Sequence, residues 1–126
     1  MKSPRKIALT LAGVLMAGYA QAADPIDLSC SGTVVHRSDR TEPVANVSLV
    51  VNLDENTVTF EIVTDITSID DNSVSFIGTG DHIAVNGWID RVTGAASVYL
   101  KTFEANGEYI LDDNYELVCR VPKRLF

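Results

Sequence analysis

Basic residues are scarce in this sequence, and the shortage limits the partners it can have. Ten Lys and Arg residues stand against 17 Asp and Glu residues, a net charge of −7. Three of the ten lie in an N-terminal leader, so the rest of the chain carries about −10. Nucleic-acid binding requires clustered Lys and Arg, and an anionic membrane surface repels such a chain. We expect no nucleic-acid partner; the acidic surface either favours solubility or attracts a cationic partner.

Catalytic signatures are also missing. There is no Gly-x-Ser-x-Gly elbow and no glycine-rich phosphate loop. His36 and His82 have no second ligand at a metal-binding spacing, and the acidic pairs at 70–71 and 112–113 lack the spaced pattern of a calcium loop. We interpret both pairs as solvated loop residues. We predict a non-enzymatic protein without catalytic residues, metal or cofactor; a small hydrolase with carboxylates brought together by folding is the alternative.

Long apolar runs are limited to the N-terminus. Lys2, Arg5 and Lys6 precede an uncharged, mostly apolar stretch at 7–20, and Ala20-Gln21-Ala22 supplies the small residues of a cleavage site. The stretch is shorter than the roughly 20 residues that span a bilayer as a helix. We predict a signal peptide over 1–22 and one domain over 23–126, periplasmic or secreted from a bacterium, without membrane insertion after cleavage. An uncleaved anchor is the alternative.

Only two cysteines are present, Cys30 and Cys119, 89 positions apart. In the oxidising compartment that a signal peptide implies, they are expected to form a disulfide. Closing a loop of this size contributes roughly 4 to 5 kcal/mol in the chain-entropy model, whose basis is disputed. Free thiols or a metal site are the alternatives, although zinc normally takes four ligands at close spacings.

Helical periodicity is almost absent after the leader, and apolar residues alternate with polar ones instead. In the clearest segment Ala45, Val47, Leu49, Val51 and Leu53 share one face. We predict loops at 39–43 and 66–72. The predicted strands cover 27–37, 45–53, 57–65, 73–79, 81–90, 95–103, a segment starting at 108, and 114–121.

Both cysteines fall on the apolar faces of their strands, with Val121 on the same face as Cys119. A disulfide would therefore place the first and last strands side by side or opposite each other across the core. Seven or eight strands whose ends meet predict a small antiparallel β-barrel, in which closure removes exposed edges. A two-sheet β-sandwich is the alternative.

The segment 87–100 is the clearest hairpin. Asp90 and Thr93 are suited to hydrogen-bonding the turn backbone, and Gly94 to a positive φ. Three aromatic residues project from the face opposite the aliphatic one: Trp88, Tyr99 and Phe103. Such residues form either a second packing layer or a binding patch. The patch hypothesis predicts a protein partner or a homodimer; a small apolar ligand in the barrel mouth is a further possibility.

Three stretches resemble a group of small exported bacterial proteins of unknown function. They are 28–32 (LSCSG), 87–94 (GWIDRVTG) and 115–119 (YELVC), the last followed by Leu125-Phe126. The resemblance implies a periplasmic all-β domain. A looser similarity, in size and in cysteines near both ends, is to exported inhibitors of C-type lysozyme, which implies inhibition of a cationic cell-wall hydrolase. The chain lacks the Ser-Gly-x-Tyr and lysine-glycine elements of their inhibitory loops.

Overall fold

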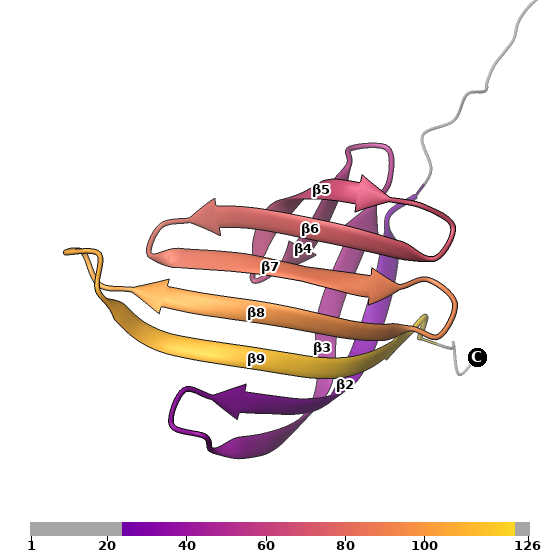
Figure 1. Ribbon diagram of the computed structural model, residues 1–126. Helices are drawn as coiled ribbons and strands as arrows, with labels where there is room; N and C mark the ends of the chain where they lie inside the picture. The colour runs from indigo at the N-terminus through magenta and orange to yellow at the C-terminus, as the bar shows by residue number, and fades with distance from the viewer. Residues whose placement is uncertain (1–23, 123–126) are drawn as a thin grey trace, which may run out of the picture.

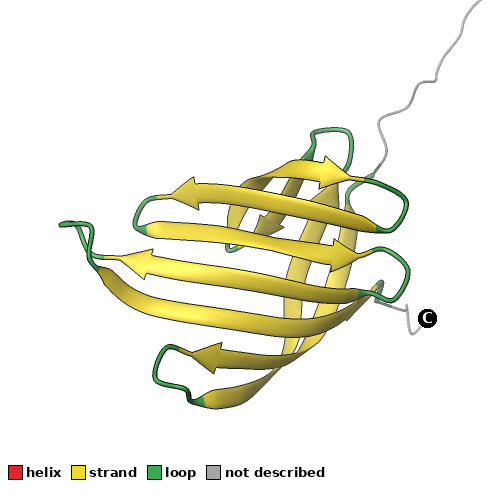
Figure 2. Ribbon diagram, viewed as in Figure 1, coloured by secondary structure: helices red, strands yellow, loops and turns green. Residues whose placement is uncertain are grey.

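The computed structural model describes residues 24–122, except for the side chains of 109–111. Every regular element in this range is a β-strand, as Figure 2 shows. The predicted all-β class is therefore confirmed. The strands are β2 (Ile26–His36), β3 (Thr41–Asn52), β4 (Thr57–Phe60), β5 (Ile62–Ile69), β6 (Ser73–Gly80), β7 (Ile83–Asp90), β8 (Ala95–Phe103) and β9 (Tyr109–Arg120).

The eight strands form a closed antiparallel barrel in which each strand pairs with its neighbours in sequence (Figure 1). Closure comes from β9, which pairs with β2 from Ser29↔Arg120 to His36↔Asp113. Cys30 and Cys119 are direct partners in this ladder and form a disulfide. Both the barrel and the disulfide were predicted, and the first and last strands lie side by side.

The core follows from the alternation of side chains, because successive residues of a strand point to opposite faces. Phe60 and Phe76 are its largest fully buried side chains, and Leu49 and Val58 pack in the same cluster. Thr64 is the one uncharged polar side chain buried with them among the described residues. Its hydroxyl donates to Val58 O at 2.5 Å, which satisfies its hydrogen-bonding capacity and ties β4 to β5.

Several predicted boundaries were wrong. β3 begins at Thr41, inside the predicted loop 39–43, and β5 continues to Ile69, into the predicted loop 66–72. The predicted strand 57–65 is divided at Glu61, whose φ of 62° reverses the chain into a tight hairpin. The segments predicted from 108 and over 114–121 form one strand, β9. At the start of β3 and the end of β5, pairing with a neighbouring strand outweighs the local polar composition.

Three side chains predicted to face the core do not. A bulge in β3 places Ala45 and Asn46 between the pairs Gly32↔Val44 and Cys30↔Val47, with Asn46 at a φ of 58°, so Ala45 is exposed. Leu53 lies in the β3–β4 turn and is partly exposed. Val121 follows the end of β9 and is 64% exposed.

The predicted signal peptide, residues 1–22, lies outside the described residues, as do 123–126. Residues 24–122 contain no helix that could span a membrane.

Candidate functional site

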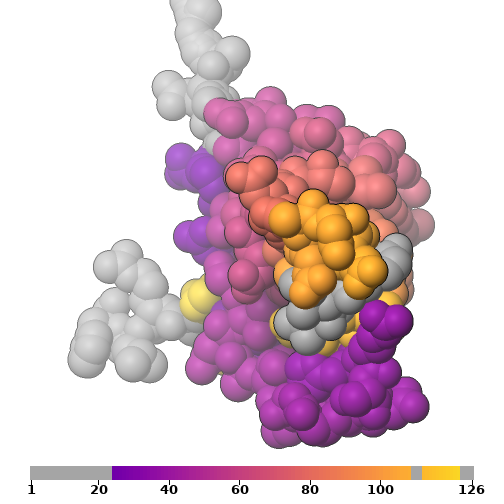
Figure 3. Space-filling model, turned by 90° about the vertical axis from the view of Figure 1, so that its left-hand side faces the viewer, coloured from indigo at the N-terminus to yellow at the C-terminus, as the bar shows by residue number. Residues whose placement is uncertain are grey.

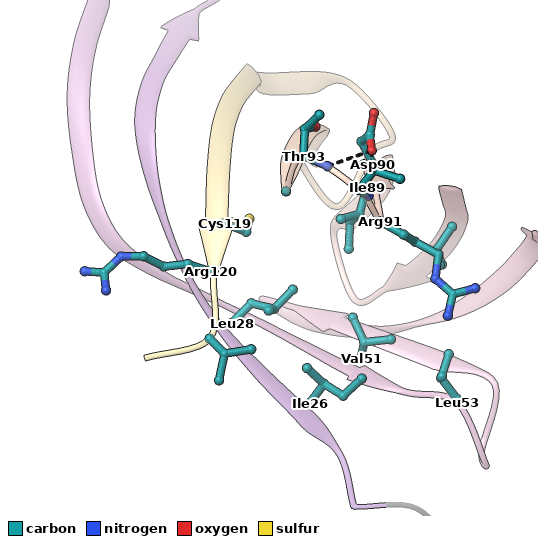
Figure 4. Close-up of a pocket in the computed structure, with 14 residues that line it drawn as sticks. Ile26, Leu28, Val51, Leu53, Ile89, Asp90, Arg91, Thr93, Cys119 and Arg120 are labelled. Atoms are coloured by element: carbon teal, nitrogen blue, oxygen red, sulfur yellow. Dashed lines mark hydrogen bonds between the residues drawn. The ribbon is translucent and has the colours of Figure 1, made fainter. Parts of the chain in front are cut away.

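One end of the barrel opens into an apolar hollow of about 310 Å³ (Figure 4). We call this hollow the mouth. It lies at the end where β2 begins, where β3 and β9 end, and where the turn from β7 to β8 stands. Its wall is mainly aliphatic. The lining residues are Ile26, Leu28, Val51, Leu53, Val74, Ile89, Asp90, Arg91, Val92, Thr93, Gly94, Cys119, Arg120 and Val121.

The mouth is hollow because of the sizes of the inward side chains. The large rings of Phe60 and Phe76 are buried in the core cluster and do not belong to the lining. At this end the strands present shorter aliphatic side chains instead, among them Val51, Val74 and Ile89. An eight-stranded barrel has an interior just wide enough to be filled by side chains or to hold one small ligand. Here the smaller residues leave the space open at one end.

The charged side chains at the mouth either bond to turns at its rim or point away from it. Asp90 Oδ1 accepts from Val92 N at 2.8 Å and Thr93 N at 3.0 Å, the second of which is dashed in Figure 4. These backbone hydrogen bonds, that from Thr93 first, lower the pKa of Asp90 below its ordinary value. Arg91 Nη1 donates to Asp70 O at 2.6 Å. The Arg120 side chain extends away from the hollow in Figure 4.

Gly94 completes this turn with a φ of 82°. A Cβ at this position would lie 2.3 Å from the carbonyl oxygen of Cys119. Cys119 N also donates to Gly94 O at 2.8 Å. The roles predicted for Asp90 and Gly94 agree with these contacts, and Thr93 Oγ1 accepts from Ala95 N at 3.2 Å.

The opposite end of the barrel carries a charged cluster that was not predicted. His36, the last residue of β2, lies between two carboxylates: its Nδ1 is 2.7 Å from Asp113 Oδ1 on β9, and its Nε2 is 2.5 Å from Glu42 Oε2 on β3. Asp113 is buried. Arg40 Nη2 donates to Glu42 at 3.2 Å. With an acceptor on each ring nitrogen, the doubly protonated imidazolium satisfies both contacts.

These contacts shift two pKa values in opposite directions. The hydrogen bond to Asp113, followed by that to Glu42, raises the pKa of His36 above its ordinary value. The hydrogen bond from His36 lowers the pKa of Glu42. The two carboxylates flank the imidazole ring. Among the described residues, no group of three His, Cys, Asp or Glu side chains is arranged to hold a metal ion.

The two acidic pairs have different environments. Asp70 accepts from Asn72 N at 2.8 Å and Ser73 N at 2.9 Å in the β5–β6 turn, as the loop interpretation predicts. The pair at 112–113 was wrongly assigned to a loop, because both residues belong to β9. There Asp113 pairs with Leu100 and points inward to His36.

The three aromatic residues predicted as a surface lie on β7 and β8 but do not form one cluster. Trp88 is 44% exposed and lies opposite Ser97, whereas Tyr99 lies opposite Asn86. Trp88 and Tyr99 are therefore diagonal neighbours. Tyr99 and Phe103 border a separate hollow of about 160 Å³, and Trp88 does not belong to its lining. Lys101 Nζ lies 5.1 Å from the Tyr99 ring centre. Binding at this surface stays a prediction.

The sequence pointed to a barrel mouth but did not identify its lining, and the His36 cluster was not predicted. His36 and Asp113 are 77 positions apart, and their proximity depends on the register in which β9 meets β2. One signal was available: both residues lie close to the strand ends that barrel closure brings together.

No family model matches the sequence, and neither the curated proteins nor the solved structures include a match to it. The fold and the mouth therefore define the class of protein: a small, disulfide-linked, eight-stranded antiparallel barrel with an apolar opening at one end.

Proposed function

We propose that this protein is an exported, non-enzymatic β-barrel that binds a small apolar ligand in its mouth. The leader at 1–22, with its basic start and its small residues at 20–22, supports export to the periplasm or the medium. The disulfide between Cys30 and Cys119 is compatible with an oxidising compartment.

The observation that carries the proposal is the apolar hollow itself. Its volume of about 310 Å³ is at the lower end of the range for small-molecule sites, roughly 300 to 1,000 Å³. Such sites have mostly apolar walls with a few placed polar groups, and the mouth has aliphatic walls with the 90–94 turn at its rim. Burying apolar ligand surface there is favourable by about 25 cal/mol per Å².

The chemistry of the wall supports binding over catalysis. Among the described residues that line the mouth there is no histidine, and the single carboxylate, Asp90, accepts hydrogen bonds from its own turn. Its lowered pKa suits a group that stays ionised, which makes it a poor proton donor near neutral pH.

The proposal is tested by titrating the exported form of the protein with N-phenyl-1-naphthylamine, a neutral apolar fluorophore whose emission rises out of water. We expect saturable binding with one site per chain. Leu28→Trp should fill the mouth, and Leu53→Asp should place a charge at its rim. Each should weaken binding about tenfold or more. Leu28→Trp occupies the volume that the ligand needs, and Leu53→Asp places an unpaired charge against the apolar ligand.

The matched control is Val63→Asp, which introduces the same charge at an exposed position of β5 away from the mouth. It should leave the affinity unchanged. Absence of saturable binding, or equal loss in the control, would rule the mouth out as the binding site.

A further inference from the structure

The barrel wall is incomplete on one side, between β3 and β4. β3 has twelve residues and β4 only four, and the two pair at three positions only, from Val50↔Thr59 to Asn52↔Thr57. All three pairs lie near the mouth. Figure 1 shows β4 as a short strand behind β6 and β7. Toward the other end, β3 pairs with β2 alone among the described residues.

The free part of β3 is therefore a sheet edge inside an otherwise closed barrel. In an antiparallel strand the backbone N–H and C=O groups point alternately to the two sides. About half of the backbone groups of residues 41–49 therefore point to the open side. Pro43 and the bulge at 45–46 lie on this stretch, and both features are typical of edges that must avoid indiscriminate pairing.

A pocket of about 440 Å³ lies along this edge. Residues 44–48 form one wall, and Phe60, Glu61 and Tyr115 form the other. Phe60 and Tyr115 meet edge to face, with ring centres 5.1 Å apart. The opening therefore combines a strand edge with an aromatic floor and a carboxylate, at a position where an incoming chain could place one side chain.

Among the described residues that line this pocket, the one charged side chain is the carboxylate of Glu61. Glu61 is exposed at its rim, in the β4–β5 turn. Burial, together with the charges of Asp113 and Glu61, raises the pKa of the Tyr115 phenol, so the hydroxyl remains a neutral donor and acceptor. An aromatic face beside a carboxylate favours a Lys or Arg side chain, and the net charge of −7 favours approach of a basic partner.

We propose that this opening binds an extended basic segment of a partner protein by strand addition. The segment pairs its backbone with the free edge of β3 at residues 44–49, and one Lys or Arg side chain enters the pocket toward Tyr115 and Glu61. Main-chain hydrogen bonds supply affinity in this mode of recognition, and the pocket supplies specificity. This site is separate from the mouth, so neither proposal depends on the other.

The test uses a blocked peptide with the sequence threonine-valine-lysine-valine-threonine and the ¹⁵N-labelled exported protein. Addition of the peptide should shift the amide resonances of residues 44–49 and 59–61 and should slow their hydrogen exchange. Replacing the peptide's lysine by glutamate should weaken binding about tenfold through charge repulsion. N-methylation of its valines, which removes backbone donors, should abolish binding.

Glu61→Gln should weaken binding of the lysine peptide about threefold, as expected for an exposed ion pair. The control is Glu55→Gln, the same change in the β3–β4 turn at the other end of the barrel, which should have no effect. Equal binding of the lysine and glutamate peptides, or of the N-methylated peptide, would overturn the proposal. Concentration-dependent dimers that protect residues 44–49 without peptide would overturn it too, since the occupant would then be a second copy of this chain.

Discussion

The two ends of the barrel are built from the same strands and differ in chemistry. At the mouth, inward aliphatic side chains surround an open hollow, and Asp90 accepts hydrogen bonds from the backbone of its own turn. At the opposite end, His36 joins β2 to β3 and β9 through two carboxylates. Figure 3 looks onto this second end, where the orange β8–β9 loop lies above the purple β2–β3 hairpin. One end of the barrel is therefore open and apolar, whereas polar contacts between strands hold the other end together.

The largest effect on this comparison is expected from removing the disulfide, since Cys119 belongs to the mouth lining. Cys30→Ala with Cys119→Ala should lower the free energy of unfolding by about 4 kcal/mol, because the 89-residue loop is no longer closed in the unfolded chain. Urea unfolding measures the loss. Hydrogen exchange should quicken more around 90–94 than around 113–116. Equal change at both ends would contradict the idea that the disulfide stabilises the mouth in particular.

The next effect comes from a matched pair of glycines, one at each end. Gly94→Ala should cost about 2 to 3 kcal/mol, because it combines a φ of 82° with a Cβ 2.3 Å from Cys119 O. Gly107→Ala has a φ of 88° but nothing within 4 Å, so it should cost only about 1 kcal/mol. Urea midpoints at constant m-value give both numbers, and equal costs would refute the packing argument.

A smaller difference between the two ends of the barrel is expected in how their stability depends on pH. Since folding raises the pKa of His36, its contribution to stability is fully present below the ordinary value of about 6.5 and is lost as pH rises through the higher folded value. Stability and exchange protection near 36–42 should fall over that range, while 90–94 should be unaffected. His36→Gln should flatten the dependence, and His82→Gln should leave it in place. If the stability of the unchanged protein did not vary with pH over this range, the stabilising role of the His36 contacts would be contradicted.

The smallest effect is expected at Glu61, which holds a φ of 62° that glycine adopts more easily. Glu61→Gly should raise the free energy of unfolding by up to about 1 kcal/mol, since relief of strain exceeds the added chain entropy. The same variant should weaken binding of the lysine peptide about as much as Glu61→Gln does. Thermal unfolding and the peptide titration measure the two effects, and a loss of stability would show that the Glu61 side chain supports the hairpin.

Much of the fold could be predicted from the sequence. Two-residue alternation identified the sheet, and two cysteines on inward faces indicated that the first and last strands meet. Residue composition was a poorer guide to where the strands begin and end. The polar segment 66–69 and the start of β3 at Thr41 form strands because their neighbours supply hydrogen-bonding partners, which local sequence does not encode.

The sites were harder to predict for a physical reason. Asp113 was read as a solvated loop residue because its neighbours are polar, and only the register Asp113↔His36 reveals its partner. The free edge of β3 depends on the shortness of β4, which the positive φ of Glu61 sets. The turn at 90–94 could be predicted because its hydrogen bonds are local.

The disulfide joins the strand that opens the barrel to the strand that closes it, so the backbone from Cys30 to Cys119 and the S–S bond form one covalent ring. Tension applied at the two ends of the chain would pass through the sulfur atoms and bypass the ring. The ladder between β2 and β9 would not be pulled apart residue by residue. To be drawn through a narrow channel, such a ring would have to pass as a double strand or be reduced first.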